Sequence, residues 1–192
     1  QASAPVLLQF ADGGLSEIPH IAQTQQALST IIAAPALSEK LLSKAPFRFL
    51  FDVVAAVALS TQWCMPLIER YDGICPSNKD EKLRFMKVLV AIVSEAMGSQ
   101  VDVNPVKCLC GQEPEKTNAL LVALAHTSSV PKEQHFELAR SGMRKVDVQM
   151  EEAWAASEAA KEERRRAEAQ RIQEDNARRA ELLRQAQEER ER

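Results

Sequence analysis

No apolar run in this chain is long enough to cross a membrane, because a spanning helix needs about 18 apolar residues. The best candidate, Phe47–Leu59, is shorter and contains Arg48 and Asp52. The first residues lack the cationic start and the long apolar stretch of a secretory signal. The sequence therefore predicts neither a membrane span nor a secretory leader.

Excess basic charge and catalytic motifs are also missing. The net charge is −3 over 192 residues, which argues against a non-specific nucleic-acid binder. The three histidines lie in separate segments. The motifs G-x-S-x-G, H-E-x-x-H, G-x-G-x-x-G and the P-loop do not occur. The sequence predicts no enzyme and no cofactor.

Cysteines are few, and their spacing is not that of a structural zinc site, which usually supplies ligands in close C-x-x-C pairs. Cys64 and Cys75 are far apart in sequence, and Cys108 and Cys110 are separated by a single residue. We expect reduced, packed thiols of a cytosolic protein and no bound metal.

Helical periodicity is what this chain does have. In the run Leu41–Asp52, Pro46 suits the first turn of a helix because its missing N–H leaves no donor unpaired there. From Phe47 onward apolar residues occupy both helix faces, which is typical of a buried central helix. Phe47, Leu50 and Val54 are expected in its core. The pattern predicts an all-α domain with helices over 19–33, 38–44, 47–61 and 79–97 and from 114, and with loops over 62–78 and 99–112.

Two motifs together indicate a family. The sequence K-L-L-S-K-A-P-F-R begins at Lys40, and G-Q-E-P-E-K-T-N spans Gly111–Asn118. With their surroundings, over residues 24–125, they resemble the N-terminal calponin-homology domain of the intraflagellar transport protein fifty-four family, the microtubule-interacting, TRAF-associated proteins. The departures are Ala34 and Ala45, where the family has proline, Phe49 and Phe51, where it has Tyr and His, and the poorly matched insert 62–77.

The resemblance implies a function. It implies a non-enzymatic adaptor of intraflagellar transport complex B, located in the cilium or flagellum, the cytoskeleton and the cytoplasm. It implies tubulin or microtubules as partners, and other complex B subunits. One of these is the small coiled-coil subunit, intraflagellar transport protein twenty, whose site usually lies further toward the C-terminus. The alternative is a calponin-homology protein fixed structurally on axonemal or cytoskeletal microtubules.

Basic residues form the candidate site. The resemblance implies that the acidic tails of tubulin dock on them, because several cations facing a flexible polyanion give salt-sensitive binding. Ordinary surface charge is the alternative, since acidic residues such as Glu39 and Glu113 lie in the same regions. Trp63 and Trp154 are candidate protein contacts, because tryptophan often anchors interfaces. The candidate tubulin-binding residues are Lys40, Lys44, Arg48, Lys79, Lys82, Lys107 and Lys116.

Composition changes after residue 126. We predict a flexible lead-in over 1–18, the calponin-homology domain over 19–126, a linker with a short helix over 127–142, and a long charged helix over 143–192. Gly142 is expected to stop the short helix. Beyond it, opposite charges recur at helical spacing, as with Glu162 and Arg166. No heptad seam is sustained, so a solvated single helix is favoured over a coiled coil, and both stay open.

Overall fold

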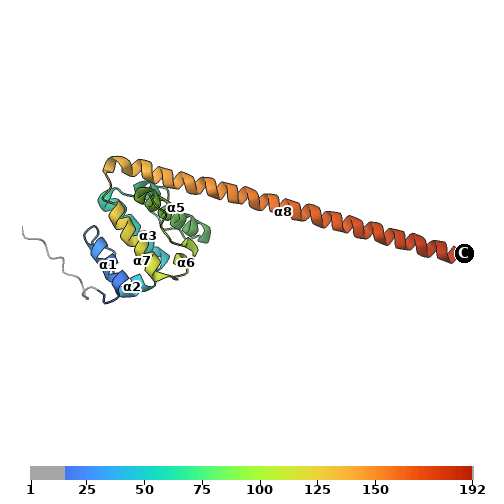
Figure 1. The fold of residues 1–192 in the computed structure, drawn as a ribbon, viewed down its shortest axis with the longest axis horizontal. Coiled ribbons are helices and arrows are strands. Elements are labelled where there is room, and N and C mark those ends of the chain that lie inside the picture. Colours follow the sequence, from blue (N-terminus) through green and yellow to red (C-terminus); the bar gives the residue numbers. More distant parts are fainter. Residues whose placement is uncertain (1–15, 192) are drawn as a thin grey trace, which may run out of the picture. The chain divides into compact units, whose positions relative to one another are not determined.

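The computed structural model describes the backbone of residues 16–191, and its regular structure there is entirely helical (Figure 1). The all-α prediction is confirmed. Of the predicted flexible lead-in, residues 1–15 lie outside the described residues. The helices are α1 Pro19–Ser29, α2 Glu39–Ser43, α3 Phe47–Thr61, α4 Met65–Glu69, α5 Lys79–Met97, α6 Pro105–Leu109, α7 Pro114–Thr127 and α8 Lys132–Glu191.

The long helices begin and end at residues suited to those positions. Helix α3 starts directly after Pro46 and stops at Gln62, which takes the left-handed conformation with φ 66°. The side chain of Asn78 accepts a hydrogen bond from the Asp80 N–H at 2.8 Å, which satisfies one of the free donors at the start of α5. Gly98 ends α5 with φ 64°. The predicted bounds of both helices are confirmed, and so is the start of α7.

Three details of the predicted secondary structure are wrong: the end of the first helix, and two predicted loops that each contain a short helix. The first helix ends at Ser29, four residues before its predicted end at Ala33. The predicted loop 62–78 contains α4, and the predicted loop 99–112 contains α6. Both extra helices have only five residues, too few for an apolar period to show. Each begins with a proline in its first turn.

Helix α3 lies in the core of the domain. Leu50 is 1% exposed and Val54 is fully buried. Phe47, at the start of α3, packs edge-on against Phe85 of α5 with ring centroids 5.7 Å apart. Phe51 follows one turn later, 5.2 Å from the same ring. The predicted burial of Phe47, Leu50 and Val54 is confirmed.

A buried amide ties three segments together. Asn118 of α7 is 1% exposed, and its Nδ2 donates to the Leu42 carbonyl at 2.8 Å and to the Pro114 carbonyl at 2.8 Å. The hydroxyl of Thr24 on α1 donates a hydrogen bond to the backbone carbonyl of Asn118 at 3.4 Å. A buried polar group is costly unless it is hydrogen-bonded, so these bonds hold α1 and the end of α2 against α7.

The described part of the chain divides into two units, the first ending at Val146 and the second beginning at Asp147. The first turns of α8 belong to the first unit, where Ala139 and Val146 are buried. The helix stop predicted at Gly142 is wrong, because α8 continues to Glu191. This glycine serves packing: a Cβ at residue 142 would lie only 2.7 Å from the backbone nitrogen of Ile92.

Glu95 gives the packing of α8 on α5 a pH dependence. Its carboxylate accepts hydrogen bonds from Lys145 and, at 3.3 Å, from Ser141. The hydrogen bond from Lys145 lowers the pKa of Glu95 below its ordinary value. A carboxyl with a lowered folded pKa adds stability above its unfolded pKa of about 4.3 and loses it as pH falls through the folded value.

We therefore expect Glu95→Gln to lower the melting temperature of the first unit at neutral pH. The difference from the unaltered protein should shrink as the pH falls below about 4, because both proteins then carry an uncharged side chain at residue 95. Thermal melts across this pH range, followed by circular dichroism, measure it. A difference that stays constant with pH would contradict the assignment.

Candidate functional site

The corner between α2 and α3 joins two parts of the domain that are far apart in sequence. On one side, the side-chain carbons of Lys44 lie over Gly111 in the α6–α7 loop, where an added Cβ would be 2.9 Å from the Lys44 Cγ. On the other side, the Phe47 ring lies under Lys82 of α5, whose Nζ is 5.8 Å from the ring centroid. Lys44, which directly follows α2, and Arg48, the neighbour of Phe47 on α3, therefore lie at the same corner as Lys82 of α5.

The basic residues of the corner differ in how their charge is compensated. Arg48 donates from Nε to Asp52 at 3.0 Å, and this hydrogen bond raises the pKa of the guanidinium. Burial raises the pKa of the nearby Cys75 thiol, while the charges of Arg48 and Lys82 oppose that rise. Lys40, Lys44 and Lys79 are exposed and form no ion pair with the residues described.

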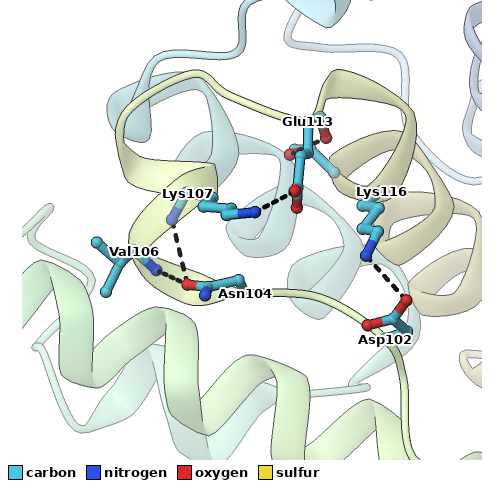
Figure 2. A network of polar contacts seen from close by, with 7 residues as sticks. Asp102, Asn104, Val106, Lys107, Glu113 and Lys116 are labelled. Carbon is cyan, nitrogen blue, oxygen red and sulfur yellow. Dashed lines mark hydrogen bonds and ion pairs between the residues drawn. The ribbon is translucent and has the colours of Figure 1, made fainter.

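Two further candidate cations lie around α6 and are paired (Figure 2). Lys107 reaches across the loop to Glu113, and Lys116 donates to Asp102 at 2.9 Å. The hydrogen bond from Lys116 lowers the pKa of Asp102, and the same bond raises the pKa of Lys116. The Asn104 side chain caps α6 below them, accepting from the N–H groups of Val106 and Lys107.

Three of the candidate cations lie where the helix dipole does not favour a positive charge. Arg48, Lys79 and Lys116 lie in the first turns of α3, α5 and α7. The N-terminal end of a helix carries partial positive charge and favours acidic side chains. Helix α3 has no acidic residue in its first turn, although α5 and α7 do. The cations therefore add to the positive potential of the helix ends, which suits an anionic partner.

The predicted contact role of Trp63 conflicts with its burial. Trp63 is 0% exposed and its ring lies 5.0 Å from that of His135 on α8. The residue belongs to the core, because it lies in the short turn between α3 and α4 and the first turns of α8 pack against it. Trp154 lies in the second unit and is 69% exposed.

The sequence motifs located the cations, but their ion pairs had to be read from the structure. Lys107 with Glu113 and Lys116 with Asp102 meet only because α6 turns the chain back toward α7. The structural role of Asn118 was also missed, although this residue ends the motif G-Q-E-P-E-K-T-N. The residues next to Asn118 in the sequence give no indication that its side chain donates a hydrogen bond to the Leu42 carbonyl.

Other kinds of site are not evident among the described side chains, which are those of residues 16–188. Within that stretch, no group of three or more His, Cys, Asp or Glu side chains is arranged to hold a metal ion. Its four cysteines are free thiols, with Cys64 and Cys108 buried. None of its helices combines the length and the apolar character that crossing a membrane requires.

The residues described above form an all-helical domain with exposed lysines at the α2–α3 corner and at the start of α5. A family model described as the microtubule-binding protein MIP-T3 CH-like domain matches residues 20–130. The chain belongs to this family, and the predicted resemblance is confirmed.

Individual relatives agree with the family match. The chain is 36% identical over 107 residues to TRAF3-interacting protein 1 of Danio rerio, covering 54% of this chain and 17% of the relative. It is 34% identical over 105 residues to the protein of that name in Rattus norvegicus, covering 53% of this chain and 16% of the relative. The match therefore spans about a sixth of the length of these relatives.

Proposed function

We propose that the first unit of this chain binds tubulin or microtubules through the exposed lysines of the α2–α3 corner and of the start of α5, and that the protein is a non-enzymatic adaptor in intraflagellar transport. Membership of a family described as microtubule-binding supports the partner. The observation that carries the site is the exposure of Lys40 and Lys44 without ion pairs among the described residues.

Charge compensation ranks the candidate residues. An exposed cation that already pairs with a carboxylate has part of its charge compensated, so it attracts an acidic partner less strongly than an unpaired cation does. Arg48, Lys107 and Lys116 are in this position. No ion pair is found for Lys40, Lys44 or Lys79 among the described residues. We therefore propose that these three lysines make the main contacts with the acidic partner. Lys82 contributes through its position over the Phe47 ring, where a cation is held by the aromatic face.

The test reverses the charge of the unpaired lysines. The variant Lys40→Glu, Lys44→Glu, Lys79→Glu is expected to bind tubulin at least about tenfold more weakly, because each exposed contact contributes roughly 0.5 kcal/mol. Arg48 is left unchanged, since a glutamate there would face Asp52. Binding is measured by co-sedimentation with microtubules and by titration of soluble tubulin.

The matched control is Lys87→Glu, Lys132→Glu, Arg144→Glu, which alters the net charge equally at exposed positions of the first unit outside the corner. It should retain binding, and both variants should keep their helical circular-dichroism signal. Removal of the acidic tubulin tails by a protease should reproduce the loss. So should salt near about 0.3 M, where the screening length is only a few ångströms. Unchanged affinity in the first variant would refute the site.

The adaptor role is distinguished from a fixed axonemal role by fractionation of flagella. A transport adaptor is expected to co-purify with subunits of intraflagellar transport complex B, including the coiled-coil subunit implied by the family resemblance. A structural protein of the axoneme would instead stay on doublet microtubules after salt extraction. Retention on the doublets, without transport subunits in the soluble fraction, would favour the second function.

A further inference from the structure

The second unit of the chain is a helix without a buried face. From Asp147 to Glu188 almost every side chain is exposed, and no glycine or proline interrupts the segment. Its large apolar side chains are exposed as well: Trp154 by 69%, Ile172 by 56% and Leu183 by 67%. A helix that is polar all round is stable only when many side-chain pairs support it or when a partner covers it.

Ion pairs along the helix supply that support. Glu162 accepts from Arg166 at 3.2 Å, four residues along, and also lies 3.8 Å from Arg165. Glu181 accepts from Arg184 at 3.1 Å, and Lys161 donates to Glu158 at 2.7 Å. The pair predicted between Glu162 and Arg166 is confirmed. Each such pair stabilises a helix, and alanine, with the highest helix propensity, fills many of the remaining positions.

The apolar residues do not form a seam for a second helix. A coiled coil needs apolar residues at alternating spacings of three and four over several heptads. Trp154 and Ile172 are separated by charged and small residues at every position that would continue such a pattern, including Lys161, Arg165 and Glu168. A paired helix would bring these charges into its interface.

We infer that residues 147–191 form an autonomous single α-helix that acts as a semi-rigid spacer. At about 1.5 Å per residue the segment is about 65 Å long, and its ion pairs hold that length without a partner. The mechanical consequence is that groups attached at its two ends stay apart, instead of approaching as they do on a flexible linker. This inference does not depend on tubulin binding.

The test measures a distance inside the helix, in the full chain. Spin labels are attached at Ser157→Cys and Gln187→Cys, with the more accessible Cys75 and Cys110 replaced by serine; Cys64 and Cys108 are buried. The expected result is a narrow distance distribution near about 45 Å. Sedimentation equilibrium should give the mass of one chain at every concentration. A short, broad distribution, or association into dimers, would overturn the proposal.

A pair of variants tests the cause of the rigidity. Glu162→Gln with Glu181→Gln removes the ion pairs with Arg165, Arg166 and Arg184 while keeping a similar helix propensity. The control, Glu163→Gln with Glu168→Gln, removes two carboxylates for which no ion pair is found within residues 16–188. The first variant should broaden the distance distribution and lose helical signal at a lower temperature than the control. Equal behaviour of the two would show that these pairs do not hold the helix.

Discussion

Replacing Leu50 with alanine is expected to lower the free energy of unfolding of the first unit by about 2–5 kcal/mol. Leu50 is 1% exposed and lies on α3 among Val53, Val54 and Phe51, which are also buried. The cost has two sources: the lost burial of the leucine side chain, and the cavity that its rigid neighbours cannot fill. A loss of this size is a large part of the stability of an ordinary domain.

The matched control is Leu59→Ala on the same helix. Leu59 is 69% exposed, so its truncation should change the free energy by no more than about 0.5 kcal/mol. Urea unfolding, followed by the fluorescence of buried Trp63 in a Trp154→Phe background, reports on the first unit alone. If Leu50→Ala also cost less than about 0.5 kcal/mol, α3 would not be the centre of the core.

Replacing Gly142 with alanine is expected to destabilise the first unit, although alanine is the better helix former by about 1 kcal/mol. The added Cβ would lie 2.7 Å from the Ile92 nitrogen and 2.8 Å from its Cα. These are backbone atoms of α5 and cannot move aside as a side chain can. Overpacking of this kind costs about 1–3 kcal/mol, so the net effect should be destabilising.

Arg144→Ala, two residues along α8 at an exposed position, is the control for the helix itself. It should leave the free energy of unfolding unchanged within about 0.5 kcal/mol. Stabilisation by Gly142→Ala would instead mean that α8 does not pack closely on α5 at this point. The sign of the change is therefore the decisive result, measured in the same urea titrations.

The long elements of this fold could be predicted because their signals are local. Helices α3 and α5 begin directly after Pro46 and Asn78 and end just before residues with positive φ, and their apolar periods are long. The five-residue helices α4 and α6 could not be predicted, since one turn of helix carries no period. Gly142 was misread because a glycine that ends a helix and a glycine that admits a neighbouring backbone look alike in sequence.

For the candidate site, the sequence supplied the family and the names of the cations, and their role in binding stays a prediction. The motif around Lys40 and Lys44 identified the right family, and the cations could be named from the sequence alone. Which cations already have partners depends on contacts such as Lys116 with Asp102, which only the folded chain creates. Trp63 was predicted as a protein contact because tryptophan often anchors interfaces, but it is fully buried. The first turns of α8, which lie outside the family match, cover it.

The segment Glu113–Asn118 is the sharpest fingerprint of this family in the chain, and most of its side chains contact the protein itself. Glu113 pairs with Lys107, Lys116 with Asp102, Thr117 Oγ1 lies 3.2 Å from the Cys108 sulfur, and Asn118 bonds Leu42. The side chains of this segment therefore join α2, α6 and α7 through hydrogen bonds and ion pairs. A sequence search that finds this segment therefore detects residues that hold the architecture of the domain together, and such a match does not by itself identify a binding surface.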